Sequence, residues 1–131
     1  MPATSARPDL PIYEEILRME PHEIVGGLVG VLGKKITAYL AGVKDTRTVD
    51  AWLEPGRAED GARRLDFDRL RVALRVAKLL ATRESNGVVQ AWFGGSNPQL
   101  GDRNASRLLR EGNAAQQEFV LNAARAFVVG G

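Results

Sequence analysis

Apolar residues recur at intervals of three and four along most of the chain, the periodicity of amphipathic helices, and no segment alternates convincingly as a strand would. The strongest case is the segment 65–83, in which Leu70, Leu74 and Ala77 share one face. The pattern predicts an all-α fold with about seven helices and no sheet. The candidate segments for these helices number eight and cover residues 12–19, 21–32, 35–41, 47–53, 65–83, 86–93, 105–110 and 114–128.

Residues with known capping preferences mark several of the expected helix ends. Gly42 and Gly112 follow helical segments, where glycine ends helices without steric cost. Asn104 precedes a short helix as a candidate N-cap. Asn113 and Gln116 have the spacing of a capping box, which predicts that the last helix begins at Ala114.

The chain has 131 residues, and its charge divides it into two parts. Residues 1–61 have a net charge of −3, whereas residues 62–131 have a net charge of +5. The segment 54–61 is rich in turn-forming and charged residues, and we expect no core residue in it. We therefore predict a flexible segment 1–11, a helix–turn–helix-like module 12–57 and a second domain 62–131.

The residues required by common catalytic and metal sites are missing. There is no cysteine, and the one histidine, His22, has no partner at metal-ligand spacing. The segment 30–35 lacks the spacing of a phosphate-binding loop, and no serine lies in a Gly-x-Ser-x-Gly motif. We predict that the protein is not an enzyme and binds neither metal nor cofactor. No apolar segment has the length of a membrane span, and we expect a soluble cytoplasmic protein.

The segment 34–55 has the sequence of a helix–turn–helix. A turn at Gly42-Val43 separates two short helices, and the second is capped by Asp45 or Thr46 and anchored by buried Val49 and Trp52. A DNA-reading helix presents its first residues to the bases, while cations around it bind phosphates. The alternative is a helical hairpin kept as a scaffold, which the acidic balance of this half favours. The candidate DNA-binding residues are Lys34, Lys35, Lys44, Thr46, Arg47 and Thr48.

The last helix is apolar on two sides. One stripe comprises Ala115, Phe119, Ala123, Ala126 and Phe127, and the other comprises Val120, Leu121, Ala124 and Val128. We expect one stripe to enter the core and the other to need a second surface, unless the domain wraps both. The final residues 127–131 have no polar tail, so they suit a cleft in a partner; the alternative is an idle, frayed terminus.

A basic stripe lies on the helix 65–83. Arg71, Arg75 and Lys78 follow helical spacing away from the apolar face. The stripe suits an acidic partner surface or DNA, and the alternative is a solvated helix face.

Four motifs in the second half occur in a specific order. They are Ala-Trp-Phe at 91–93, Asn-Pro-Gln-Leu-Gly at 97–101, Arg-Leu-Leu-Arg-Glu-Gly at 107–112 and Ala-Ala-Arg-Ala-Phe at 123–127. In this order the motifs resemble the Xre/MbcA/ParS toxin-binding domain of antitoxins. Upstream, the segment 38–52 resembles the helix–turn–helix of the MbcA-like branch, so the resemblance covers about residues 25–131. One departure is Ala105, where many members have proline.

The resemblance implies an antitoxin of a type II toxin–antitoxin system. Its partner would be a RES-domain toxin that consumes NAD⁺, with the antitoxin's C-terminal segment covering the toxin's active site. Repression of the operon through DNA binding, and a homodimer within a larger hetero-oligomer, are further implications. The alternative is a stand-alone helix–turn–helix repressor without a toxin partner. The candidate toxin-binding residues are Trp92, Phe119, Val120, Ala124, Phe127, Val128, Val129, Gly130 and Gly131.

Overall fold

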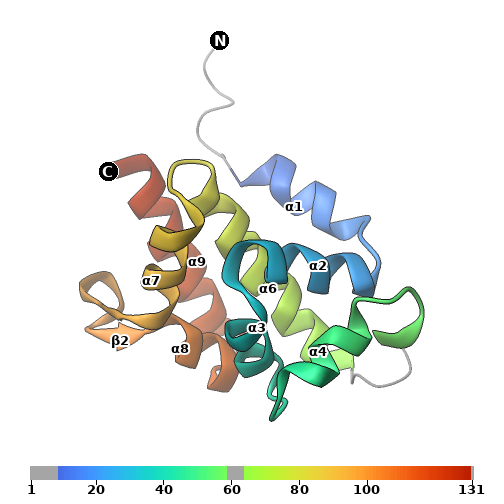
Figure 1. Ribbon diagram of the computed structural model, residues 1–131. Coiled ribbons are helices and arrows are strands. Elements are labelled where there is room, and N and C mark those ends of the chain that lie inside the picture. Colours follow the sequence, from blue (N-terminus) through green and yellow to red (C-terminus); the bar gives the residue numbers. More distant parts are fainter. Residues whose placement is uncertain (1–8, 59–63, 131) are drawn as a thin grey trace.

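The computed structural model describes residues 9–58 and 64–130, and it confirms the all-α prediction (Figure 1). Eight α-helices are bounded within these ranges, against about seven expected. Their limits agree with the predicted ones to within about two residues. The helices are α1 Leu10–Leu17, α2 Pro21–Leu32, α3 Lys34–Ala41, α4 Thr46–Trp52, α6 Arg64–Ala81, α7 Asn86–Gly94, α8 Ala105–Glu111 and α9 Ala114–Gly130.

A small antiparallel pair between α7 and α8 corrects the expectation of no sheet. Strands β1 (Ser96–Asn97) and β2 (Arg103–Asn104) flank a short 3₁₀ helix, η2 (Pro98–Leu100). The chain reverses because Gly101 and Asp102 both adopt positive φ, at 67° and 62°. The side chain of Asn97 accepts a hydrogen bond from the Gln99 amide at 2.9 Å and fixes the start of this turn.

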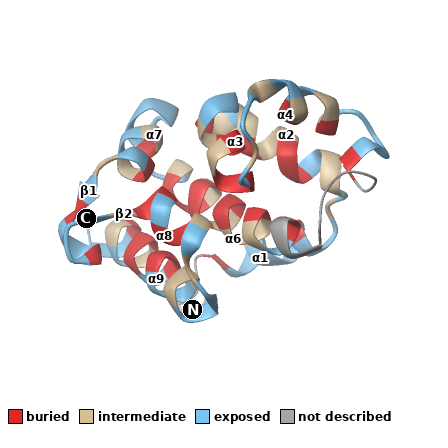
Figure 2. Cartoon of the chain, turned by 90° about the horizontal axis from the view of Figure 1, so that it is seen from below, coloured by how far each residue is buried: buried red, intermediate tan, exposed pale blue. Residues whose placement is uncertain are grey.

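Helix α6 lies at the centre of the molecule and packs against α1, α2, α3, α7, α8 and α9. Its predicted apolar face is buried at Leu70, Leu74 and Ala77, and Figure 2 shows buried residues along α6 and the inner faces of the helices around it. Helix α2 approaches α6 closely at Gly27, where an added Cβ would lie 3.0 Å from a Leu74 methyl. The buried apolar residues of both halves form one cluster.

The predicted helix caps are present in the structure. Asp45 is the N-cap of α4 and accepts hydrogen bonds from the amides of Arg47 and Thr48 at 3.0 and 3.4 Å. Asn113 and Gln116 exchange two hydrogen bonds of 3.0 Å, which form the capping box at the start of α9. Asn104 caps α8, and Gly42 ends α3 in the left-handed conformation with φ 78°.

The segment predicted to separate two domains contributes to the core. Ala58 is fully buried, so the expectation that residues 54–61 contain no core residue is wrong; residues 59–61 lie outside the described ranges. Helices on either side of this segment pack together, α2 on α6 and α3 on α8. The division into modules 12–57 and 62–131 stays a prediction about how the chain folds.

Arg69 of α6 joins the two halves through backbone carbonyls. Its guanidinium donates hydrogen bonds to Leu40 and Ala41 at the end of α3, at 2.8 and 3.3 Å. A third bond of 2.9 Å reaches the carbonyl of Arg110 in α8. One arginine therefore places the C-terminal ends of α3 and α8 beside each other.

Candidate partner-binding surfaces

Helix α9 divides cleanly into a buried and an exposed side. Val120, Leu121, Ala124 and Val128 face α6 and α8 and belong to the core of this chain. Five of its exposed residues are spaced by four and three along the helix, so they form one stripe. We call this set the α9 stripe: Ala115, Phe119, Asn122, Ala126 and Val129.

Two large apolar side chains of the α9 stripe are exposed, and the more exposed of the two lies in the last turn of the helix. Val129 is 68% exposed and Phe119 is 37% exposed. The guanidinium of Arg103 in β2 lies 5.5 Å from the centre of the Phe119 ring, which holds this ring at the surface. The last turn of α9 is fixed to the turn that follows α6, because Arg83 donates a hydrogen bond of 2.6 Å to the Val128 carbonyl.

Burial corrects part of the predicted toxin-binding set. Val120 and Ala124 have no exposed surface and Val128 has only 6%, so the core of the chain itself occupies the stripe to which they belong. The helical periodicity identified two apolar stripes, but it did not show which of them faces inward, and Ala123 of the other stripe is buried as well.

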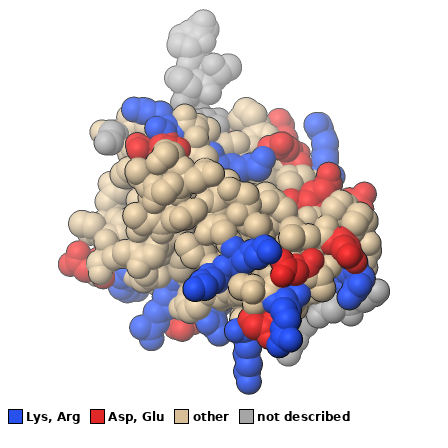
Figure 3. Space-filling model, in the orientation of Figure 1, with Lys and Arg blue, Asp and Glu red and all other residues tan. Residues whose placement is uncertain are grey.

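The other predicted toxin-binding residues differ in exposure. Trp92 and Phe127 are half-buried against the core, and the Trp92 ring packs edge-to-face on Phe93 with centroids 5.9 Å apart. Gly130 is exposed, whereas Gly131 lies outside the described residues. The surface over α7, the helix of Trp92, carries few charged side chains on the face shown in Figure 3.

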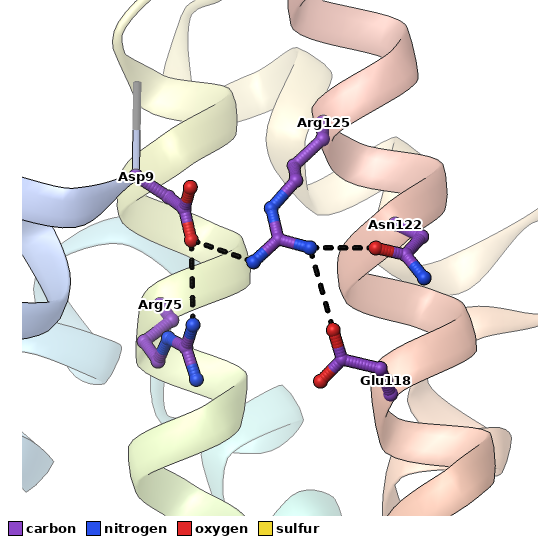
Figure 4. Close-up of polar contacts among 5 residues, drawn as sticks. All are labelled: Asp9, Arg75, Glu118, Asn122 and Arg125. Atoms are coloured by element: carbon purple, nitrogen blue, oxygen red, sulfur yellow. Dashed lines mark hydrogen bonds and ion pairs between the residues drawn. The ribbon is translucent and has the colours of Figure 1, made fainter. Parts of the chain in front are cut away.

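A buried carboxylate ties the N-terminal helix to α6 and α9 (Figure 4). Asp9, which is fully buried, precedes α1, and its Oδ2 lies 2.8 Å from Arg125 of α9 and 3.3 Å from Arg75 of α6. The hydrogen bond from Arg125 lowers the pKa of Asp9 and raises that of Arg125. Arg125 also contacts Asn122 and Glu118 on its own helix, at 2.6 and 3.3 Å.

The predicted basic stripe of α6 is neutralised within the chain. Arg75 pairs with Asp9 and lies 4.5 Å from the centre of the Tyr13 ring of α1. Lys78 pairs with Glu15 of α1 at 3.1 Å, and Arg71 pairs with an aspartate on its own helix. Helix α1 therefore covers much of the stripe, which is neither an open partner surface nor a freely solvated face.

The predicted DNA-binding residues lie on α3, on α4 and in the turn between them. Lys35, Lys44 and Thr46 line one hollow of about 680 Å³. Lys34 instead pairs with Asp50 at 2.7 Å. The expected anchors of this unit, Val49 and Trp52, are buried and so confirmed.

The remaining two predicted DNA-binding residues differ in exposure. Arg47 is highly exposed and lies 3.6 Å from Asp45, and Thr48 is half-buried.

Sequence reasoning missed two residues at this hollow. Tyr39 of α3 and Arg110 of α8 also line it, and the Arg110 guanidinium lies 4.5 Å from the centre of the Tyr39 ring. Arg110 was assigned only to the end of a short helix, because no local pattern connects it with residues some seventy positions earlier. The contact arises from the packing of α3 on α8.

Within residues 9–58 and 64–130, no three acidic or histidine side chains lie together in a way that would hold a metal ion. Over the same residues, no helix combines the length and apolar character needed to cross a bilayer.

These features define a small all-helical protein with an exposed apolar helix stripe and, elsewhere, a hollow lined with cations. Its fold is similar to that of a chain in the crystal structure of the M. tuberculosis MbcT–MbcA toxin–antitoxin complex, with a TM-score of 0.64 and 23% sequence identity. The match covers 83% of this chain and 94% of that chain. It confirms, for the fold, the resemblance that the sequence motifs indicated. No family model matches the chain, and no curated protein matches it in sequence.

Proposed function

We propose that this chain is an antitoxin that binds and inhibits a toxin protein. The observation that carries the proposal is the fold match over 83% of the chain to a chain of a toxin–antitoxin complex. The ordered sequence motifs between Ala91 and Phe127 support the same assignment. The α9 stripe supplies an apolar surface of the kind that a protein partner covers.

In this proposal the α9 stripe and the end of α9 contact the toxin. Burial of Val129 and Phe119 would supply most of the apolar contact; because both are already partly covered, each would contribute less than the roughly 1.5–3 kcal/mol of a fully exposed side chain. A RES-domain toxin that consumes NAD⁺ is the partner that the motifs imply. The end of α9, with Val129 and Gly130 exposed, would then cover the entrance of its active site and exclude the substrate.

The first test compares two substitutions of matched exposure. Val129→Arg places a charge in the last turn of α9, and Leu17→Arg places one in the last turn of α1, where Leu17 is 63% exposed. We expect Val129→Arg to weaken toxin binding by at least about tenfold, because the charge would be buried without a partner. Leu17→Arg should bind as the unmodified protein does.

The readouts are the affinity for the toxin and the rate of NAD⁺ consumption in its presence. The toxin to use is a RES-domain protein encoded beside the gene for this chain. Equal inhibition by both variants would exclude the α9 stripe as the inhibitory surface. If no neighbouring gene encodes such a protein, the assignment of the partner fails.

We further propose that the unit formed by α3, the turn and α4 binds operator DNA and represses the operon. Lys44 and Arg47 are exposed on it, and Figure 3 shows Lys and Arg side chains along the lower part of the view, with acidic ones among them. Replacing both by alanine should weaken binding to DNA from the upstream region and flatten its dependence on salt, since each phosphate contact contributes about 0.9 to that slope. Unchanged binding by this double variant would contradict this part of the proposal.

A further inference from the structure

Two adjoining hollows form a continuous groove between α3 and α8. One has a volume of about 480 Å³ and is lined by α3, the end of α7 and the start of α8. The other, of about 680 Å³, is lined by α3, the turn that follows it and α8. Lys35 and Tyr39 line both hollows, so the two are neighbouring parts of one surface feature, which we call the α3–α8 groove.

Three cations on the α3–α8 groove have no carboxylate partner among the described residues. These are Lys35, Lys44 and Arg110, and none of them lies within 4.0 Å of an acidic oxygen in residues 9–58 and 64–130. The two neighbouring cations are paired, Lys34 with Asp50 and Arg107 with Glu111. The charge available in the groove therefore belongs to these three residues.

The carboxylate that borders the groove is already engaged. Asp45 lines the larger hollow, but one of its oxygens caps α4 by accepting hydrogen bonds from the amides of Arg47 and Thr48. Its other oxygen lies 3.6 Å from the Arg47 guanidinium. Local repulsion of an anion by Asp45 is thereby reduced. The hydroxyl of Thr46 lines the same hollow and has no hydrogen-bond partner within the described residues.

Arg110 is held in position before any ligand binds. Its guanidinium lies against the Tyr39 ring, which restricts the side chain through a cation–π contact. Its backbone carbonyl accepts a hydrogen bond from Arg69, which also binds the end of α3. The distance between Arg110 and the cations of the α3–turn–α4 unit is thus fixed by the fold.

We infer that the α3–α8 groove binds consecutive phosphates of a duplex DNA backbone, with Arg110 contributing a contact from the second half of the chain. Two neighbouring hollows suit a chain of anions better than a single small one, and the larger hollow borders the proposed DNA-reading unit at Thr46. The inference rests on the proposed DNA binding. The inference adds that the DNA interface spans both halves of the protein, whereas the DNA-binding residues predicted from the sequence all lie in the first half.

The test is a salt titration of binding to a short labelled duplex from the upstream region and to an unrelated duplex of equal length. Arg110→Gln should weaken binding to both duplexes by the same factor and reduce the salt slope by about 0.9, the contribution of one phosphate contact. The double variant Lys35→Gln, Lys44→Gln should reduce the salt slope by about 1.8, because it removes two phosphate contacts. Arg110→Lys should retain most of the slope because the charge is kept.

The matched control is Arg18→Gln at the C-cap of α1, which removes an exposed arginine outside the groove and should leave the slope unchanged. Thermal unfolding of each variant separates loss of a contact from loss of the fold. Equal slopes for Arg110→Gln and Arg18→Gln would overturn the groove assignment. The groove assignment would also be overturned if the unmodified protein bound poly-glutamate but not DNA. The same holds if it bound neither polymer.

Toxin inhibition by the same variants reports separately on the antitoxin proposal, because Arg110 is not part of the α9 stripe. An Arg110→Gln protein that inhibits the toxin but has lost the phosphate contact supports both proposals. Retained DNA contacts with no inhibition by any variant would refute the antitoxin proposal alone.

Discussion

Asp9 and Arg125 are 116 positions apart in the chain and form a hydrogen bond of 2.8 Å. The same carboxylate oxygen contacts Arg75, so the residue that precedes α1 is joined to both α6 and α9. Helix α1 itself contributes one fully buried apolar residue, Ile16. Its attachment to the molecule therefore depends strongly on charged groups.

Asp9→Asn should lower the free energy of unfolding by about 1–3 kcal/mol, because the two arginines lose a charged acceptor in a buried place. It should also change the pH dependence. The pKa of Asp9 is lowered in the folded state from its usual 3.8, so the stability it supplies is present above that pH and is lost as the pH falls below it. Urea unfolding from pH 6 down to pH 2 measures both effects.

The control for this carboxylate is Asp68→Asn, which removes an exposed partner of Arg71 and should cost less than about 0.5 kcal/mol. The same acid sensitivity in the unmodified and Asp9→Asn proteins would show that Asp9 does not contribute to it.

Neighbouring glycines of α2 should respond oppositely to alanine. Gly26 has open space around an added Cβ, so Gly26→Ala should stabilise by up to about 1 kcal/mol through the helix propensity of alanine. Gly27→Ala would bring a methyl to 3.0 Å from Leu74, and this crowding should offset or reverse the gain. Thermal unfolding of the two variants measures this difference in stability. Equal stabilisation by both would contradict the prediction, because it would mean that α2 and α6 can separate to admit the Gly27 methyl without cost.

Arg69→Met should destabilise by about 2 kcal/mol or more, because the carbonyls of Leu40, Ala41 and Arg110 lose a charged donor. Arg71→Met, two positions along α6, removes only an exposed ion pair and serves as the control. Chemical denaturation gives both values, and comparable losses would contradict the role of Arg69 as a link between α3 and α8.

Adjacent residues of α9 should separate stability from partner binding. Val120→Ala should cost about 2 kcal/mol of stability through the cavity it leaves, yet the folded variant should bind the toxin normally. Phe119→Ala should cost about 1–2 kcal/mol, from its contact with Arg103 and the covered part of its ring, and should weaken toxin binding. Unfolding and toxin titration of both variants provide the measurement. Weakened toxin binding by Val120→Ala and normal binding by Phe119→Ala would contradict the prediction and place the buried stripe at the interface.

Local features of the chain were predictable because their causes are local. Asn104, Asn113 and Gly42 end or begin helices through contacts with residues a few positions away, and sequence spacing alone reveals these. The helix over residues 65–83 and its buried face followed from its helical periodicity. The α3–turn–α4 unit with buried Trp52 was predictable for the same reason.

Features that depend on packing between distant segments were not predictable. Nothing near Arg75 or Lys78 in sequence shows that α1 supplies their carboxylates, and nothing near Arg110 points to Tyr39. Both stripes of α9 are apolar, so their composition did not show which residues α6 and α8 would cover, and Ala123 of the first stripe is buried with the second. The small β1–β2 pair likewise needs the positive φ values of two consecutive residues, which sequence patterns do not specify.

The last turn of α9 is held by the bond between Arg83 and the Val128 carbonyl, while the capping box fixes the opposite end. A partner therefore binds a helix that is already ordered. Binding then loses less conformational entropy than the folding of a disordered tail on a partner would. The heat capacity of association would then reflect the apolar surface buried between the two proteins, without a contribution from folding of α9. Differences in affinity among partners would arise chiefly from how slowly the complexes dissociate.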